Sequence, residues 1–383
     1  MDSRLRDYAT ETQWRYMEAI EQHGSGRNAA IALGVSKSTI NEARQLVLRK
    51  AAQHGYAPAE GLNHPTPLGF NVKGVSTLYD ADGQQKAQWV KTTADDEARI
   101  KALHMAVAAL SDDIPRAQPV NPPINVNADL CNLFVLTDYH VGMLAWRKEG
   151  GADWDLKIAE DTLDRVFRYT IAKAPDAETI VICQLGDFLH FDGLESVTPT
   201  SGHHLDADGR FEKVVGVAIR ALRNVVDLAL AKHQKVILIN AEGNHDIASS
   251  VWLRQMFAAL YENEPRVTVE TSPHPYYAYR HGRAMLGFHH GHLRKMDNLQ
   301  GVFAAQFAEM WGQTKYRYAH CGHLHHQRVK EDFGMTVTQH RTLAARDAYA
   351  SRDGWFAERK ASLTTYHKEF GEVGNIHLTP EMT

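Results

Sequence analysis

Five short segments rich in histidine and aspartate carry the residue types that bind transition metals. Asp138-Tyr-His140 and Gly186-Asp187 come first in the chain, followed by Gly243-Asn244-His245-Asp246. His289-His290-Gly-His292 and Gly322-His323-Leu-His325 complete the order. Carboxylate and amide oxygens combined with neutral imidazole nitrogens suit manganese, iron or zinc better than calcium. The residues therefore predict a centre for two divalent metal ions, and hydrolysis of an anionic phosphoester is the chemistry that such a centre serves.

Each of these segments follows a run of apolar and β-branched residues that is typical of a buried strand. The runs are Leu133 to Leu136, Thr179 to Leu185, Val236 to Ile239, Ala284 to Phe288 and Tyr316 to Cys321. Long helical patterns at Leu156 to Ala172 and Phe211 to Ala231 separate the first three runs. This alternation indicates an α/β layered domain, and we expect the polar side chains to converge at the strand ends of one sheet.

Chance offers a competing explanation for isolated histidine pairs, because the chain contains 22 histidines. A single Gly-His or His-x-His pair carries little weight for that reason. Five motifs in order, each after a predicted strand, favour a functional centre over a fold whose metal site has decayed.

The ordered motifs resemble the signature of the calcineurin-like metallophosphoesterase superfamily, from Asp129 to the end of the chain. The resemblance implies a layered β-sandwich flanked by helices, with two divalent ions at its centre. Mn²⁺ is the expected ion, with Mg²⁺, Fe²⁺ or Zn²⁺ as alternatives. One ion would be held by Asp138, His140 and His325, the other by Asn244, His290 and His323, with Asp187 bridging both. In its own segment His290 is favoured over His289, with His292 in reserve.

The same resemblance implies hydrolysis by a hydroxide that bridges the two metal ions and attacks phosphorus in line with the leaving oxygen. His245 would face the substrate and donate a proton or stabilise developing charge. Asp246 would orient that imidazole and raise its basicity. His190, in Gly186-Asp187-Phe-Leu-His190, would touch the substrate or support a ligand, and it is not assigned to the metal ions.

Residues 1–54 are predicted to form a small all-α domain. Glu11 to His23 has helical apolar spacing, and Arg27 to Leu33 with Ser36 to Lys50 matches a helix-turn-helix around Gly34. DNA is therefore a predicted partner, and a helical bundle used for protein contact or dimerisation is the alternative. The side chains that would reach phosphates and base edges are Lys37, Thr39, Asn41 and Arg44.

Residues 55–128 are expected to connect this domain to a third one, residues 129–383. Phe70 to Leu78 and Gln88 to Lys91 flank the turn sequence Asp80-Ala-Asp82-Gly83, which predicts a β-hairpin. Thr93 to Leu110 has the pattern of an amphipathic helix, and Pro115 to Pro123 that of a linker. The connection resembles a segment of phage and prophage proteins that join a helix-turn-helix to a metallophosphoesterase.

Two polar segments of the third domain are candidates for substrate contact. Glu195 to Arg210 contains His203 and His204, and Trp146-Arg147-Lys148 could stack on a base and contact a phosphate backbone. Solvated surface loops are the competing explanation for both. The later cations Arg341, Arg346 and Arg352 lie near a helical pattern that suggests no role.

The composition is that of an ordinary globular protein with more than one domain. The chain has 383 residues, of which 44% are hydrophobic and 23% charged, and its net charge is −4. Affinity for nucleic acid must therefore come from local patches. Cys131, Cys183 and Cys321 suit reduced core thiols. Neither a membrane span nor a signal peptide is expected, so we predict a cytoplasmic protein with no membrane partner, which could form a homo-oligomer.

These observations lead to three functional hypotheses. The first is a metal-dependent phosphodiesterase, most specifically a DNA nuclease to which the helix-turn-helix brings its substrate. The second is a phosphoesterase that acts on a small nucleotide or another phosphate ester. The third is a non-catalytic DNA-binding module on a metallophosphoesterase scaffold, and the complete set of ligand residues argues against it.

Overall fold

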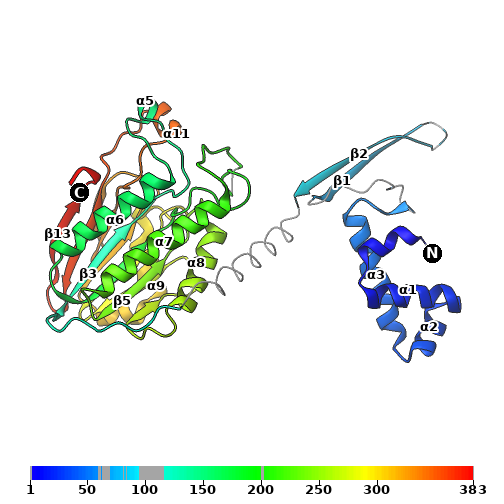
Figure 1. The fold of residues 1–383 in the computed structure, drawn as a ribbon, viewed down its shortest axis with the longest axis horizontal. Coiled ribbons are helices and arrows are strands. Elements are labelled where there is room, and N and C mark those ends of the chain that lie inside the picture. The colour runs from blue at the N-terminus through cyan, green and yellow to red at the C-terminus, as the bar shows by residue number, and fades with distance from the viewer. Residues whose placement is uncertain are drawn as a thin grey trace. The chain divides into compact units, whose positions relative to one another are not determined.

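The computed structural model describes residues 2–58, 62, 70–80, 82, 84–94, 116–199 and 202–382. The chain divides into two compact units, residues 1–105 and 106–383, which are considered separately. Figure 1 shows the helices of the amino-terminal unit in blue and the carboxy-terminal unit from cyan to red.

The amino-terminal unit opens with helices that pack around small apolar side chains. Thr10, Ser25 and Ser36 each cap one of its described α-helices by accepting a hydrogen bond from a backbone N–H of the first turn. Gly34 has a φ of 66°, the left-handed conformation that lets the chain turn sharply between the second helix and the third. The helices are η1 Ser3–Tyr8, α1 Glu11–His23, α2 Gly26–Leu33 and α3 Lys37–Gln53.

The predicted β-hairpin is present, with longer strands than expected. β1 Phe70–Tyr79 pairs antiparallel with β2 Gln85–Ala94. The Asp80 carboxylate accepts hydrogen bonds from the backbone N–H groups of Asp82 and Gln84, which fixes the turn. Because β2 includes Thr93 and Ala94, the predicted helix does not begin at Thr93, and the rest of that prediction lies outside the described residues.

The carboxy-terminal unit contains a six-stranded sheet in the order β13-β12-β3-β4-β5-β6. The strands from β3 to β6 run parallel, and β12 is antiparallel to both of its neighbours. The bounds are β3 Asn127–Leu136, β4 Ala177–Gln184, β5 Lys235–Asn240, β6 Val267–Val269, β12 Ala361–His367 and β13 Gly371–Leu378. The parallel arrangement places the carboxyl ends of β3, β4 and β5 at one edge of the sheet.

A second, five-stranded sheet has the order β10-β11-β9-β8-β7. Its central strands β8 and β9 run parallel, so their carboxyl ends also share an edge. The bounds are β7 Tyr277–His281, β8 Ala284–Phe288, β9 Tyr316–Cys321, β10 Arg328–Asp332 and β11 Met335–Gln339. The sequence patterns predicted β8 and β9 with these bounds, but not the neighbouring strands.

The main core fills the space between the two sheets. Cys131, Leu133 and Val135 alternate along β3 and pack with Leu286 and Phe288 of β8. The three cysteines are buried and unpaired, as expected for core thiols. On the other face of β3, the Phe134 ring meets Phe167 of helix α6 (Leu156–Lys173) edge to face, with 4.9 Å between centroids.

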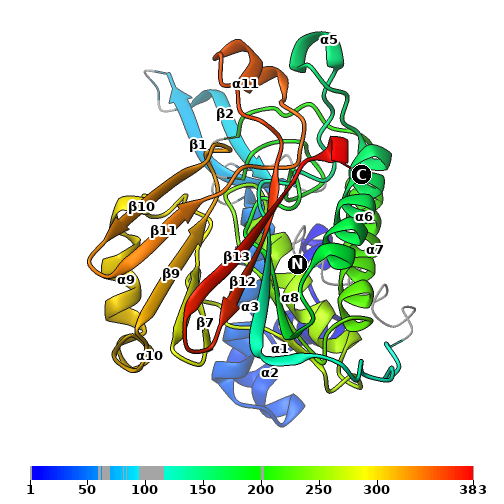
Figure 2. The same cartoon turned by 90° about the vertical axis from the view of Figure 1, so that its left-hand side faces the viewer.

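Helices cover the outer face of each sheet, so the unit is the layered α/β sandwich that the sequence predicted. Figures 1 and 2 show α6 and α7 along the six-stranded sheet, and Figure 2 shows α9 and α10 beside the five-stranded one. The helices are α5 Arg147–Gly150, α6 Leu156–Lys173, α7 Phe211–Leu230, α8 Ile247–Leu260, α9 Leu299–Gln306, α10 Ala308–Gln313, α11 Ala348–Arg352, and the short η3 Met296–Asn298 and η4 Pro380–Met382. Among the described residues, no helix has the length and apolar character that crossing a membrane requires.

The proline-rich segment before β3 lies along the carboxy-terminal unit. The backbone N–H of Ala117 donates to the Leu260 carbonyl, and that of Val120 donates to the Glu264 carboxylate. Arg116 pairs with Glu262, with 3.0 Å between Nε and Oε1. These contacts tie the described part of the predicted linker to the end of α8.

Candidate metal centre

All five predicted metal-binding segments begin at the carboxyl ends of parallel strands. The first three follow β3, β4 and β5 of the six-stranded sheet, and the last two follow β8 and β9 of the five-stranded sheet. The expectation that they would converge on one sheet was therefore wrong. Two sheets contribute, and the sandwich brings their strand ends together because the sheets pack face to face.

Hydrogen bonds join the loops that carry the ligands. The backbone N–H of Asp138 donates to the Gly186 carbonyl, and that of His140 donates to the Asp187 carbonyl, both at 3.0 Å. Across the sandwich, the backbone N–H of His323 donates to Asp138 Oδ2 at 2.9 Å. The backbone N–H of His245 donates to Asp187 Oδ1 at 2.8 Å. Each loop is thus positioned by its neighbours.

The predicted ligands gather into two adjoining groups. Asp138, His140 and His325 form one group, and Asp187, His290 and His323 form the other; within each, the ligand atoms lie within 4.8 Å of one another. Four histidines and two carboxylates from distant parts of the sequence thereby reach metal-binding distance. The first group has the three residues that the family resemblance assigned to one ion, and the second combines Asp187 with two of the three residues assigned to the other.

His290 is the histidine of its segment that points into this cluster. Its Nε2 lies 3.1 Å from Asp187 Oδ2, 3.3 Å from Asn244 Oδ1 and 3.9 Å from Asp138 Oδ1. His289 instead stacks on Tyr276, with 4.4 Å between ring centroids. His292 stacks on His289, with 5.8 Å between centroids. The structure therefore places His290 between the two aspartates and turns His289 away from them.

The ligands occupy an unusual backbone conformation. Among the described residues, six non-glycine residues have positive φ, and five of them are predicted ligands: Asp138, His140, Asp187, His323 and His325, with φ between 49° and 71°. A side chain disfavours this left-handed region, and such strain concentrates at functional sites. The backbone is thus bent at the positions where the side chains must converge.

The glycines of the motifs are required because neighbouring segments of the chain approach one another closely there. A Cβ on Gly186 would lie 2.6 Å from His290 Nδ1, and one on Gly243 would lie 2.8 Å from Asp187 Cγ. A Cβ on Gly322 would collide with the Thr137 side chain. Contacts this short are sterically forbidden, so each glycine lets a ligand loop pack against the next.

The shifted pKa values of the clustered groups indicate that the site stabilises positive charge beside its two carboxylates. Burial opposes the anionic form of Asp187, but His290 and His245 outweigh it and hold the pKa of Asp187 well below its usual range. Burial likewise opposes a charged His290, yet the carboxylates of Asp187 and Asp138 raise the pKa of His290 to about 9. Burial lowers and Asp138 raises the pKa of His325, and Asp347 adds to the net upward shift. A bound cation would stabilise the two carboxylates in the same way as the protonated histidines do.

Two further observations show that the residues fit a metal ion. Two imidazole nitrogens face the buried Asp138 Oδ1, His325 Nε2 at 3.2 Å and His290 Nε2 at 3.9 Å, whereas Oδ2 accepts bonds from the Thr137 hydroxyl and the His323 N–H. His290 Nδ1 lies 3.0 Å from the Leu185 carbonyl oxygen, which can only accept, so Nδ1 donates and Nε2 faces the cluster. Metal-binding histidines are commonly oriented this way.

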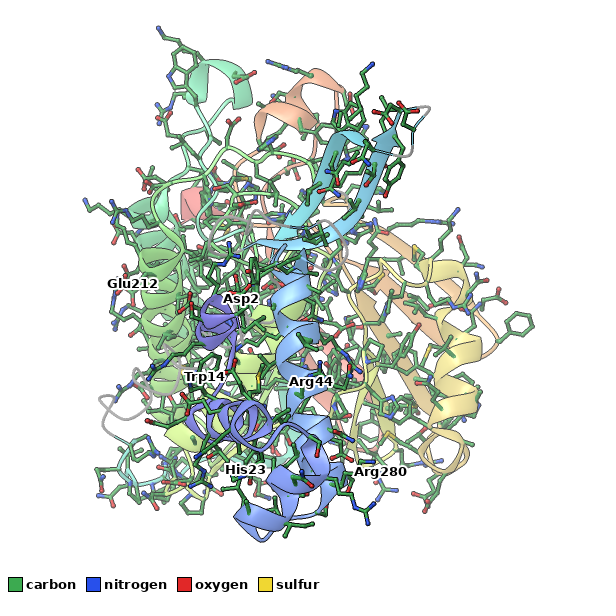
Figure 3. The ribbon with its side chains drawn as sticks, turned by 90° about the vertical axis from the view of Figure 1, so that its right-hand side faces the viewer. Asp2, Trp14, His23, Arg44, Glu212 and Arg280 are labelled. Carbon is green, nitrogen blue, oxygen red and sulfur yellow. The ribbon has the colours of Figure 1, made fainter. Side chains whose placement is uncertain are left out.

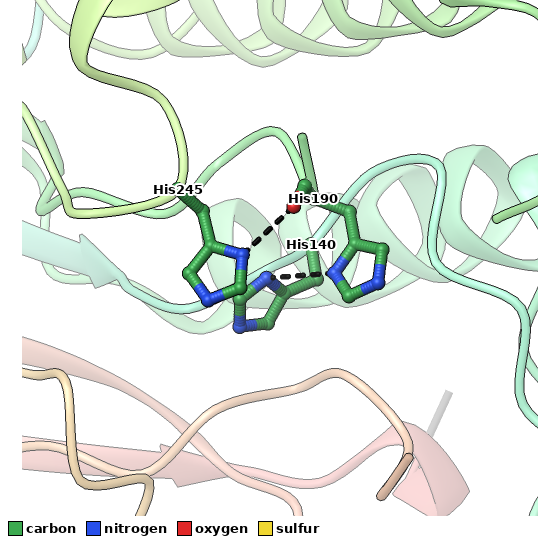
Figure 4. A group of neighbouring side chains, drawn as sticks. All are labelled: His140, His190 and His245. Carbon is green, nitrogen blue, oxygen red and sulfur yellow. Dashed lines mark hydrogen bonds between the residues drawn. The ribbon is translucent and has the colours of Figure 1, made fainter. Parts of the chain in front are cut away.

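His245 lies beside the first ligand group and is held by His190, as Figure 4 shows. His245 Nδ1 lies 2.8 Å from the His190 carbonyl oxygen and therefore donates to it. The His245 ring centroid lies 4.8 Å from that of His140. The Nδ1 atoms of His190 and His140 are 3.3 Å apart, and the three histidines together could hold a metal ion.

Asp246 does not have the predicted contact with His245. Its Oδ1 accepts hydrogen bonds from the backbone N–H groups of Gly243 and Asp187, and its Oδ2 from those of Phe188 and Leu189. Both carboxylate oxygens therefore bind the backbone of the two loops that carry Asp187 and Asn244. The orienting contact comes from His190, whose position three residues after Asp187 was the available sequence signal.

The polar loop from Glu195 to Arg210 is partly anchored beside the site. The Asp208 N–H donates to the Gly142 carbonyl, and the Leu144 N–H donates to the Asp206 carbonyl. The His190 ring also hydrogen-bonds to the backbone of Asp206. His203 and His204 are exposed, and neither belongs to the ligand groups found among the described residues.

Comparisons with known proteins found similar solved structures. Neither a family model nor a curated protein matches the chain. A predicted phosphoesterase from Streptococcus pneumoniae aligns with 9% identity and a TM-score of 0.29, over 66% of this chain and 98% of that one. The phosphoesterase Yfce from E. coli aligns with 15% identity and a TM-score of 0.33, over 64% and 98%. An archaeal phosphodiesterase aligns with 11% identity and a TM-score of 0.34, over 64% and 99%.

Because these identities and TM-scores are low, the ligand geometry is the basis for assigning a function. The described side chains form a buried, carboxylate-containing and histidine-rich centre at the meeting edge of two sheets. Such a set of ligands suits divalent transition metals.

Proposed function

We propose that this protein is a metal-dependent phosphodiesterase, and most specifically a DNA nuclease. The observation that carries the proposal is the pair of adjoining ligand groups around Asp138 and Asp187. Two such sites in contact are typical of enzymes that hydrolyse phosphoesters, because paired ions stabilise both the attacking and the leaving oxygen.

We assign the proposed ligands to two ions. Asp138, His140 and His325 would hold one ion, His290, His323 and the Asn244 amide the other, and Asp187 would bridge them. Two divalent ions at these ligands would lower the pKa of water and neutralise the phosphoryl charge. Asp187 also supports His245, since its Oδ1 accepts the His245 backbone N–H.

His245 is the group best placed to move a proton. Its Nδ1 donates to the His190 carbonyl, which leaves Nε2 available to a substrate beside His140. In the charged form of the ring, the Nε2–H could be donated to the leaving oxygen of a phosphodiester. His190 would act as a positioning residue, because its carbonyl fixes the His245 ring.

A hydrolysis assay with metal added back tests the proposal. Metal-free protein would be given Mn²⁺, Mg²⁺ or Zn²⁺ with labelled single-stranded DNA, duplex DNA, a generic phosphodiester and a phosphomonoester. We expect Mn²⁺-dependent DNA cleavage, and a fall in kcat of about 10²-fold to 10⁴-fold in His245→Ala, the usual contribution of a general acid. His274→Ala is the matched control, because His274 is exposed and lies outside the ligand groups found among the described residues.

Each outcome of this assay bears on one hypothesis. Cleavage of only the small esters would replace the nuclease with a small-phosphoester hydrolase. Bound metal without any turnover would support the third hypothesis, a non-catalytic DNA-binding module.

The amino-terminal helices supply the reason for choosing DNA. Ala30 of α2 and Ile40 of α3 pack in one hydrophobic cluster, and the half-buried Val35 between the two helices packs against it. Lys37, Thr39, Asn41 and Arg44 are exposed, although the Thr39 hydroxyl also contacts the Ser36 cap at 2.8 Å. A helix that presents cations and amides in this way could enter a major groove.

Arg44→Ala is expected to weaken duplex binding and to lower its salt dependence. Arg44 lies on α3 (Figure 3), exposed and without an ion pair among the described residues. Loss of one phosphate contact should reduce the slope of log K against log salt concentration by about 1. The measurement is fluorescence anisotropy at several salt concentrations, with Arg15→Ala on α1 as the control. An unchanged slope would contradict a role for α3 in DNA contact.

A further inference from the structure

We propose that two loops at one end of the carboxy-terminal unit form a stacking platform for unpaired nucleotides, an inference that deepens the proposed nuclease function. The loops are residues 145–154, which carry α5, and residues 342–360, which carry α11. Together they are called the aromatic lobe. Figures 1 and 2 show α5 and α11 side by side.

The first loop is anchored directly behind His140. Ala145 and Trp154 close its base with two backbone hydrogen bonds of 2.9 and 3.0 Å. The buried Trp154 indole donates to the His140 carbonyl at 3.4 Å and packs edge to face on Tyr139, between the first two ligands. The loop therefore starts from the backbone of the metal centre.

The second loop is anchored to the same ligand segment from the other side. The Thr342 hydroxyl donates to the Asp138 carbonyl at 2.6 Å. The Lys360 N–H donates to the Thr342 carbonyl at 2.8 Å, and Arg359 Nε donates to the Leu343 carbonyl at 2.7 Å, which closes the loop at its base.

The two loops contact each other away from their bases. A Cβ on Gly150 would collide with the Arg346 carbonyl, so the end of α5 packs directly on the chain before α11. Arg352 pairs with Glu149, with 3.7 Å between Nε and Oε1. Segments about 200 residues apart in sequence thus form one surface whose two bases lie at Asp138 and His140.

Large aromatic side chains on this surface are exposed instead of packed. The exposed fractions are 59% for Trp146, 63% for Tyr349, 59% for Trp355 and 80% for Phe356. The rings of Tyr349 and Trp355 meet edge to face at 5.5 Å, and this contact holds the Trp355 ring in place. Exposed aromatic side chains that gather in one place mark a binding surface, because each leaves apolar area in water.

Cations lie among these rings in a way that suits a nucleic acid strand. Lys148 Nζ lies 5.2 Å from the centroid of the Trp146 ring, and the Arg346 guanidinium lies 5.2 Å from that of Phe356. Neither cation has an ion pair within the described part of the chain, whereas Arg147 pairs with Asp153. Arg346 Nη1 also donates to the Trp355 carbonyl at 3.3 Å, which ties this cation to the backbone of Trp355. Aromatic faces for bases beside cations for phosphates are the combination that binds single strands. A base can stack on an exposed ring only when it is unpaired, so the bases inside a duplex are excluded as ligands of this surface.

Binding of short oligomers to the metal-free full-length protein tests the inference, because no cleavage occurs during the measurement. The probes are a labelled 15-nucleotide oligothymidylate, an oligouridylate of equal length and an abasic strand of equal length. We expect both base-bearing probes to bind more tightly than the abasic one. We expect the oligothymidylate to bind at least as tightly as the oligouridylate, and clearly tighter binding of the oligouridylate would overturn DNA as the ligand of this surface.

Trp146→Ala and Trp355→Ala should each weaken binding of the base-bearing probes about tenfold, the usual effect of losing one stacked base. The double variant should bind these probes no better than the abasic strand. Trp89→Ala is the matched control, since Trp89 is 58% exposed on β2 of the other unit. Thermal unfolding of each variant checks that the fold is retained.

A double variant that keeps the preference for base-bearing strands would overturn the stacking platform. So would equal binding of the base-bearing and abasic probes by the unaltered protein. Failure of the proposed hydrolysis is seen separately, as a lack of turnover of a generic phosphodiester by the metal-loaded unaltered protein. The two proposals can therefore fail independently.

Discussion

An Asp187→Asn variant is expected to lose at least about 10³-fold of its kcat on every phosphoester that the unaltered protein hydrolyses, equivalent to about 4 kcal/mol of transition-state stabilisation. Asp187 is the carboxylate shared by the centre: its Oδ2 lies 3.1 Å from His290 Nε2, and its Oδ1 accepts the His245 N–H. Asparagine keeps the size and one acceptor oxygen but removes the negative charge. The variant should therefore fold while binding its metal ions poorly.

The measurement is kcat together with the metal content of the purified variant. Asp164→Asn on α6 is the matched control, because Asp164 has an ordinary ion pair with Arg168 outside the ligand groups. DNA affinity of the amino-terminal helices should be unchanged in both variants. Full activity in Asp187→Asn would refute the assignment of the metal centre.

Removal of metal is expected to lower the melting temperature of the carboxy-terminal unit by roughly 10–20 °C. A ligand that binds only the folded state at 100 times its Kd contributes about 2.7 kcal/mol, so two ions contribute about 5 kcal/mol. In a domain of this size each kcal/mol shifts the melting temperature by about 2–4 °C. The physical cause is the burial of Asp138 and Asp187 in one cluster, where cations offset their charge.

Differential scanning calorimetry with chelator and with a series of Mn²⁺ or Zn²⁺ concentrations measures this effect. The melting temperature should rise with metal concentration in the unaltered protein and in Asp164→Asn, and much less in Asp187→Asn. A melting temperature independent of metal over the whole series would contradict a metal centre in the folded state.

The sequence predicted the strands that carry the site because those strands are buried and β-branched. Runs such as Thr179 to Leu185 correspond to β4, and Ala284 to Phe288 is β8. Strands at or near a sheet edge, such as β10, expose alternate side chains and gave no comparable signal. The division into two sheets was missed because β8 and β9 have the same local pattern as β3 and β4, and pairing between strands is a long-range property.

Residue types and the family resemblance suggested the candidate ligands, whereas the contacts that support them could not be predicted in this way. Sequence adjacency suggested that Asp246 serves His245, but successive side chains at the start of α8 point in different directions. Asp246 turns toward the backbone of the loop after β4, and the carbonyl of His190 takes its expected place. Every residue has a backbone carbonyl, so the sequence does not mark the one that makes such a contact, and only the structure shows it.

The left-handed backbone conformation of the proposed ligands lowers the stability of the fold at positions that hydrolysis would require. Glycine adopts this conformation without the penalty that a histidine side chain incurs at positions such as His140, His323 and His325. In a chelator, replacing one of them with glycine could therefore strengthen the fold while destroying the centre. Selection of variants for heat resistance alone would tend to discard the ligands, and only selection that demands turnover would keep them.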